Sequence, residues 1–177
     1  RDNVFRDNYG YETPCITVYG AFPAVVDGNE FRDVTTGVYI AGANEAQISN
    51  NHFYDCFGDY ALRIGGETDY NVMHANVYNN VFRYCYPGAV YVTNPASFTG
   101  MTTDIHHNLV EYSYGYGVTY HDYRGALEPS SVHHNRMTMN GWSGMYVGGN
   151  SWEANLVLEE NYMDVNGLLH AGIIDAE

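Results

Sequence analysis

The sequence contains no lysine: its seven basic residues are all arginines, set against 21 aspartates and glutamates, and the formal net charge is -14 at pH 7. Proteins that bind nucleic acid contact phosphates with a basic surface, so this charge excludes nucleic acid as the expected partner. The charge also disfavours an anionic membrane or a polyanionic polysaccharide, unless a divalent cation bridges the two negative surfaces.

Long apolar runs are missing as well. No stretch approaches the ~18 consecutive apolar residues of a membrane-spanning helix, and we therefore expect no membrane partner. Tyrosine (18 residues) and glycine (19) are abundant, and valine, isoleucine and phenylalanine recur in short alternating runs. This composition is typical of β-structure with many turns.

One pattern recurs along the whole chain: an asparagine followed two residues later by a large apolar residue. A second short apolar alternation lies between successive copies. The asparagines recur every 22 to 29 residues. Short strand signals at this spacing, with no helical periodicity, favour stacked rungs of parallel strands. The repeat asparagines are Asn3, Asn29, Asn51, Asn80, Asn108, Asn135 and Asn161.

Stacking at ~4.8 Å places each aligned residue above its counterpart in the next rung. A side-chain amide both donates and accepts, so the stacked asparagines can bond along the axis and satisfy the turns. We therefore predict a structural role for them. The apolar residues that follow predict an inward stack of Phe5, Phe31, Phe53, Phe82, Val110, Met137 and Met163.

On these repeats the sequence resembles the right-handed parallel β-helix proteins of the pectin-lyase-like superfamily, over essentially the whole chain. The resemblance implies an all-β, right-handed parallel β-helix (solenoid) of about seven rungs with an Asn ladder. That superfamily holds polysaccharide lyases, glycoside hydrolases and non-catalytic adhesins, so the fold leaves the activity open. We expect one domain over residues 1–177, without recognisable end caps and forming a segment of a longer solenoid.

The resemblance also implies that a substrate lies along the outer face of the sheet formed by the strands between the asparagine turns. Alternation along these strands predicts which side chains point outward. The first outward column is Thr17, Tyr39, Arg63, Tyr91, Thr119, Tyr146 and Ile174, and the second is Tyr19, Ala41, Gly65, Thr93, His121, Gly148 and Ala176.

The densest polar cluster beside this face is HDYRGALE at residues 121–128. An elimination next to a uronate carboxylate needs a base and a cation. Without lysine the candidate bases are His121, Tyr91, Tyr120 and Arg124, and His121 with Arg63 as the cation comes first. Hydrolysis needs two carboxyl groups, which Asp122 with either Glu128 or Asp104 would supply if the loops bring them together. The catalytic candidates are therefore His121, Asp122, Arg63, Arg124 and Glu128, and the candidates for stacking on sugar rings are Tyr19, Tyr39, Tyr91 and Tyr146.

Two histidine pairs stand one rung apart, and stacking should place His106 near His133 and His107 near His134. Four imidazoles can bind a transition metal, but no carboxylate or cysteine in the pattern completes a tetrahedral set. We therefore expect these histidines to be hydrogen-bond partners at the turns, and no metal site.

The three cysteines are an odd number, which denies a full disulfide framework. Cys56 and Cys85 share a column, and we expect them to be buried free thiols. The acidic loop residues carry oxygen atoms that suit Ca²⁺, although a solvated acidic surface also accounts for them, and we expect no required cofactor. These residues include Glu67, Asp69, Asp104, Asp122 and Glu153.

Two functions follow as hypotheses. The first is an extracellular or cell-surface protein that binds a polysaccharide on the Tyr/Arg/His-lined face; whether it also cleaves the polysaccharide, as a lyase or as a glycoside hydrolase, stays open. The second is a non-catalytic structural or adhesion shaft, such as a tailspike-like stem, a surface protein or an axially stacked filament. Homo-oligomers and end-to-end stacking through uncapped rungs also stay open.

Overall fold

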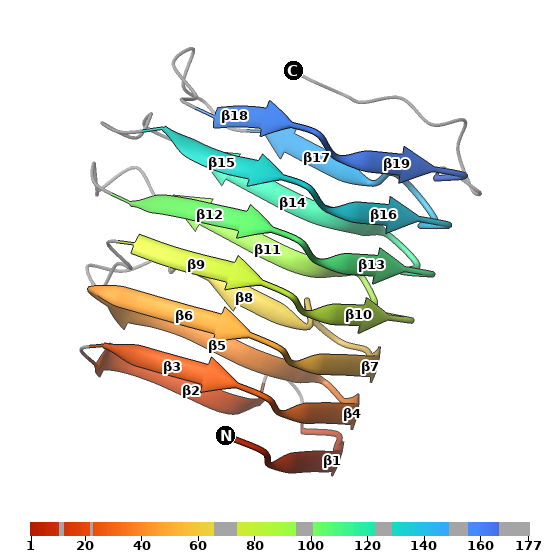
Figure 1. Cartoon of the computed structure of the whole chain (residues 1–177). Coiled ribbons are helices and arrows are strands. Elements are labelled where there is room, and N and C mark those ends of the chain that lie inside the picture. Colours follow the sequence, from red (N-terminus) through yellow and green to blue (C-terminus); the bar gives the residue numbers. More distant parts are fainter. Residues whose placement is uncertain are drawn as a thin grey trace.

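The computed structural model describes residues 1–10, 13–21, 23–65, 74–94, 101–122, 129–148 and 156–166, with the side chains of Ala21 and Asp122 left aside. Their strands stack into a solenoid with three parallel sheets (Figure 1). Between the first and last strand of each six-stranded sheet, the chain winds through about five turns. The predicted strand at residues 173–176 lies outside the described residues.

Each repeat asparagine is followed by one strand of the seven-stranded sheet, here called sheet A. The prediction of about seven rungs counts the strands of this sheet, whereas the described solenoid has about five turns. The strands of sheet A are β1 (Val4–Asn8), β4 (Glu30–Val34), β7 (His52–Cys56), β10 (Val81–Arg83), β13 (Leu109–Glu111), β16 (Arg136–Thr138) and β19 (Tyr162–Asp164).

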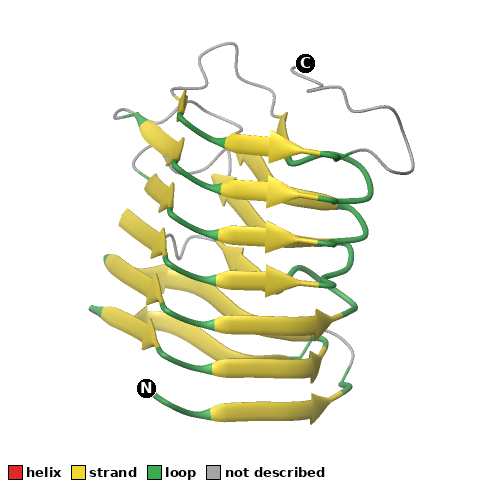
Figure 2. Cartoon of the chain, turned by 45° about the vertical axis from the view of Figure 1, so that its right-hand side comes forward, coloured by secondary structure: helices red, strands yellow, loops and turns green. Residues whose placement is uncertain are grey.

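The other two sheets have six strands each, and Figure 2 shows the three sheets wrapped around one axis. Sheet B contains β2 (Pro14–Ala21), β5 (Thr36–Ala43), β8 (Leu62–Ile64), β11 (Gly88–Asn94), β14 (Tyr116–Asp122) and β17 (Met145–Gly148). Sheet C contains β3 (Ala24–Asp27), β6 (Glu45–Ser49), β9 (His74–Tyr78), β12 (Thr102–His106), β15 (Ser130–His133) and β18 (Leu156–Glu159).

The predicted asparagine ladder is present at the turn from sheet C to sheet A. The side-chain amide of Asn108 donates to Asn135 Oδ1 at 3.0 Å and to the Val77 carbonyl at 2.9 Å. Its own Oδ1 accepts from the Asn80 side chain at 3.0 Å. The same amide-to-amide bond joins every successive pair from Asn3 to Asn161. The ladder therefore satisfies turn backbone that has no access to water.

The predicted inward stack is also confirmed. The rings of Phe5, Phe31, Phe53 and Phe82 stack at centroid distances of 4.9, 4.7 and 4.7 Å. Val110 and Met137 continue the column fully buried, and Met163 packs against its end. Cys56 and Cys85 are buried free thiols, as expected, and the Cys85 contact together with burial raises the pKa of Cys56.

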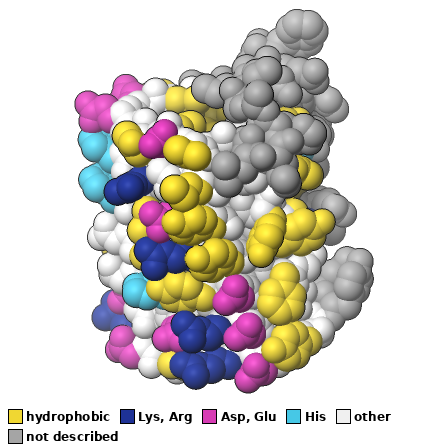
Figure 3. Space-filling view, turned by 90° about the vertical axis from the view of Figure 1, so that its right-hand side faces the viewer, with side chains coloured by type: hydrophobic (Ala, Val, Ile, Leu, Met, Phe, Trp, Pro, Cys, Tyr) yellow, Lys and Arg dark blue, Asp and Glu magenta, His cyan; other side chains and the backbone are white. Residues whose placement is uncertain are grey.

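Sequence patterning did not reveal the left-handed residue that lies at, or directly after, the end of each sheet A strand. Four residues after every repeat asparagine the backbone enters the left-handed region, with φ between 51 and 58°. Three of these residues are aspartates, which tolerate that conformation, but four are large or apolar. Tyr84 and Tyr112 in this column are exposed and stack at 5.3 Å, and Figure 3 shows apolar side chains running up this edge. The column is Asp7, Asp33, Asp55, Tyr84, Tyr112, Met139 and Val165.

Candidate functional site

The outer face of sheet B brings together most of the predicted site residues that the structure describes. Backbone register aligns Tyr39 with Arg63, Arg63 with Tyr91, Tyr91 with Thr119 and Thr119 with Tyr146. The first predicted column is therefore confirmed over these rungs. Parallel strands in register cause this alignment, because residues of equal offset lie one above another.

The second column is confirmed at one end and wrong at the other. His121 pairs with Thr93 and Gly148, as predicted. Tyr19, however, pairs with Gly42 and not with Ala41, because β2 shifts register on both sides of Tyr19. The Tyr19 ring still contacts the Tyr39 ring edge-on at 6.0 Å.

Arg63 and His121 each lie between two tyrosine rings. The Arg63 guanidinium carbon is 5.3 Å from the Tyr39 ring centroid and 5.6 Å from that of Tyr91, within cation–π range. The His121 ring is 5.5 Å from Tyr91 and 5.4 Å from Tyr146. We call the six side chains the aromatic line: Tyr19, Tyr39, Arg63, Tyr91, His121 and Tyr146.

Neighbouring groups and burial reduce the positive charge on the aromatic line. Asp59 forms an ion pair with Arg63 at 3.3 Å, and both side chains are about a quarter exposed, at 26% and 27%. Burial lowers the pKa of His121, which favours the neutral imidazole. A neutral imidazole carries a lone pair on one ring nitrogen and can act as a base near pH 7.

Sequence reasoning missed Tyr60, which precedes β8 by two residues and so falls outside the alternation. Its ring lies 4.9 Å from that of Tyr91, and its hydroxyl is 3.1 Å from Thr119 Oγ1. This contact helps to leave the outward Thr119 only 2% exposed. Burial raises the pKa of Tyr60 to about 12, so its hydroxyl stays protonated at neutral pH.

The aromatic line continues past its last predicted member. Tyr116 lies 5.0 Å from the Tyr146 ring, and Trp142 packs edge-on against Tyr116 at 5.0 Å. Trp142 is 41% exposed. These residues lie at or before the start of a strand, where the alternation used for the prediction begins.

Several predicted residues have no described side chain. Asp122 ends β14 opposite Asn94, and Arg124 and Glu128 lie outside the described residues. The two-carboxylate arrangement needed for hydrolysis is therefore untested. Of the acidic calcium candidates, only Asp104 has a described side chain, and it lies on sheet C, where its carboxylate accepts from Ser131 at 2.6 Å.

The chain matches the family described as right handed beta helix region over residues 14–175. It belongs to this family, and the resemblance inferred from the repeats is confirmed. Neither a curated protein nor a solved structure matches the chain. Within the described ranges, no helix is long and apolar enough to cross a membrane.

Proposed function

We propose that this β-helix binds a polysaccharide along the outer face of sheet B and cleaves it there. The observation that carries the proposal is the aromatic line, in which a cation and a titratable imidazole alternate with tyrosine rings. Tyrosine offers both an apolar face for a sugar ring and a hydroxyl for its polar edge. This proposal includes that the protein is extracellular or lies at the cell surface, where it would encounter polysaccharides.

The order of groups favours elimination over hydrolysis. Arg63 and His121 stand two rungs or ~10 Å apart along the axis on the two sides of Tyr91, so one uronate ring over Tyr91 would meet the cation on one side and the base on the other. Arg63 would neutralise the carboxylate of a uronate, which makes the proton on the neighbouring carbon more acidic. His121 would remove that proton in its neutral form. The electron pair then forms a carbon–carbon double bond as the glycosidic oxygen leaves, and that oxygen takes a proton from water to become the hydroxyl of the new reducing end.

The negative charge of the protein limits how much negative charge the substrate can carry. Because the net charge is -14, a densely anionic polymer is repelled unless a divalent cation such as Ca²⁺ lies between. Arg63 is the only Lys or Arg side chain on the described part of this face, which suits a chain with sparse carboxylates. We therefore expect turnover on lightly acidic polymers before highly charged ones.

The test is product release from neutral and acidic polysaccharides, with and without Ca²⁺, recording both unsaturated-uronate absorbance and new reducing ends. We expect both signals together, since elimination also frees a reducing end, and we expect H121A and R63A to abolish them. Y91A should weaken binding. Y162A, at an exposed tyrosine on sheet A, is the matched control and should leave both signals unchanged.

Reducing ends without unsaturated products would replace elimination by hydrolysis and direct attention to Asp122 and Glu128. Binding without product would keep the glycan proposal and remove its catalytic half. If neither binding nor product is seen, the competing function, a non-catalytic structural or adhesion shaft, takes its place.

A further inference from the structure

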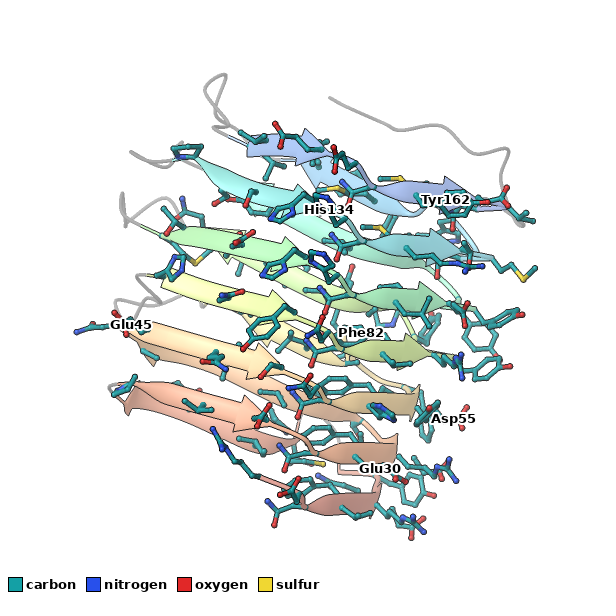
Figure 4. All side chains as sticks on the ribbon, viewed as in Figure 1. Glu30, Glu45, Asp55, Phe82, His134 and Tyr162 are labelled. Atoms are coloured by element: carbon teal, nitrogen blue, oxygen red, sulfur yellow. The ribbon has the colours of Figure 1, made fainter. Side chains whose placement is uncertain are left out.

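A second cluster of titratable side chains lies on sheet C, away from the aromatic line. His106 ends β12 and His133 ends β15, and the two residues pair in register. His107 and His134 follow in the left-handed turn position, at φ 55 and 54°. Figure 4 shows His134 on the outer surface, where the chain leaves β15 for the next strand of sheet A. The cluster is independent of the proposed glycan site.

The four imidazoles form two facing pairs. Within a rung, His106 Nδ1 lies 2.9 Å from His107 Nδ1, and His133 Nδ1 lies 2.8 Å from His134 Nδ1. Between rungs, the His106 and His133 rings stack at 5.0 Å, and so do those of His107 and His134. These contacts confirm the proximity that the sequence predicted.

In the upper pair, carboxylate oxygens contact the ring nitrogens on the side away from the facing Nδ1 atoms. His133 Nε2 is 2.9 Å from Asp104 Oδ1, and His134 Nε2 contacts the Glu160 carboxylate. An ionised carboxylate only accepts hydrogen bonds, so each of these Nε2 atoms carries its proton. From the sequence, Asp104 is expected only as a possible calcium ligand or as a carboxyl group for hydrolysis, and Glu160 is not predicted because it lies one rung above His134.

With each Nε2 directed at a carboxylate, the Nδ1 atoms of His133 and His134 are the ring nitrogens that face each other, at 2.8 Å. Two imidazole nitrogens held this close can bind one metal ion between them. A carboxylate behind the distal nitrogen of a histidine is the arrangement that orients imidazole ligands in metal sites. In the lower pair, Asn76 Oδ1 accepts from His106 Nε2 at 3.0 Å, so the Nδ1 lone pair of His106 faces Nδ1 of His107.

The spacing of the nitrogens distinguishes between metals. With metal–nitrogen bonds of ~2.0–2.1 Å, two nitrogens 2.8 Å apart subtend about 86° at the ion, whereas a tetrahedral ion needs about 3.3 Å between them. Square-planar and octahedral ions such as Cu²⁺ and Ni²⁺ take cis ligands near 90°, and Zn²⁺ prefers the tetrahedron. The nitrogen pairs therefore fit copper or nickel better than zinc.

We propose that each histidine pair is a bidentate site for a divalent copper or nickel ion, with His133–His134 backed by Asp104 and Glu160. In the described part of the chain, no three His, Cys, Asp or Glu side chains form a metal-binding group, so each ion has two protein ligands and water completes its shell. Binding to His133–His134 displaces the hydrogen bond between the two Nδ1 atoms and sends its proton to solvent, and each Nδ1 then gives its lone pair to the ion. The other titratable groups around the rings are Tyr78, Asp104, Glu159 and Glu160.

The experiment is Cu²⁺ titration of the whole chain by calorimetry and electron paramagnetic resonance. We expect about two ions per chain, each with two nitrogen couplings in its spectrum. H134Q should remove one ion, and E160Q should weaken the upper site by about 10–100-fold because it loses the carboxylate behind His134. The matched control is H52Q, at an exposed histidine on β7, which should keep both ions.

Three results would overturn the proposal: no saturable Cu²⁺ binding, a stoichiometry that H134Q leaves unchanged, or spectra without nitrogen ligands. The proposal would also be overturned if ¹⁵N resonance shows a hydrogen bond between the two Nδ1 atoms that excess Cu²⁺ does not displace. Circular dichroism of each variant confirms that the solenoid is intact. His107→Gln provides the same test on the lower pair.

Discussion

At the scale of single residues, a ladder asparagine serves several neighbours at once, and no other side chain can do so in its place. Asn108→Ala would remove the buried side-chain donor to the Val77 carbonyl and the buried acceptor of the Asn80 backbone N–H. Each group left without this partner costs about 1–3 kcal/mol, so we expect a loss of about 2 kcal/mol or more in urea unfolding. Asn44→Ala, at an exposed asparagine, is the control and should change stability by less than about 0.5 kcal/mol. Equal effects of the two variants would refute a role for the ladder in stability.

A second residue-scale prediction concerns His121. Because burial lowers its pKa in the folded protein, the unfolded chain binds a proton there more readily. The stability that the neutral ring contributes is therefore fully present above its unfolded pKa of ~6.5 and is lost as the pH falls toward the lower folded value. Urea unfolding at pH 7.5 and 5.5 should show a larger loss for the natural chain than for H121Q. Parallel losses would mean that His121 titrates alike in both states.

At the scale of strands and turns, prediction succeeded where residues at the same position in successive repeats lie one above another in the sheet. Arg63, Tyr91 and Tyr146 fell into one column because parallel strands repeat in register. Tyr19 failed because β2 shifts register there, and a shift of this kind depends on local backbone geometry that alternation does not encode. The contact of Tyr60 with Tyr91 was not predicted because Tyr60 lies before the start of β8, outside the alternation. The Glu160 carboxylate was missed because it reaches His134 from the neighbouring rung.

The turn column gives the element-scale prediction. Val165 has φ 51°, a conformation that costs most residues about 1–2 kcal/mol and that asparagine tolerates. Its side chain is 49% exposed, so little packing is lost on replacement. Val165→Asn should raise the free energy of unfolding by about 1 kcal/mol. Asp55→Val, at the equivalent exposed turn labelled in Figure 4, should lower it by a similar amount. Changes of the same sign in both variants would contradict this account of the turn.

At the scale of the whole molecule, the solenoid differs from a globular domain because each rung contacts only its neighbours. Its core is a file of side chains, with Phe53 at 4.7 Å from both Phe31 and Phe82. Contacting core residues couple energetically, whereas residues beyond ~7–10 Å act additively. The stability of the protein is then close to a sum over rungs and their interfaces.

Double-mutant cycles test this directly. Because Phe53 and Phe82 stack while Phe31 and Phe82 are two rungs or ~9.5 Å apart, F53L with F82L should show a coupling of about 0.5–1.5 kcal/mol, and F31L with F82L should be additive within about 0.5 kcal/mol. The measurement is the free energy of unfolding in urea for each single and double variant. All three rings are fully buried, so differences in exposure do not confuse the comparison. Coupling of equal size in both cycles would show that strain spreads along the axis and that the rungs do not act as nearest-neighbour units.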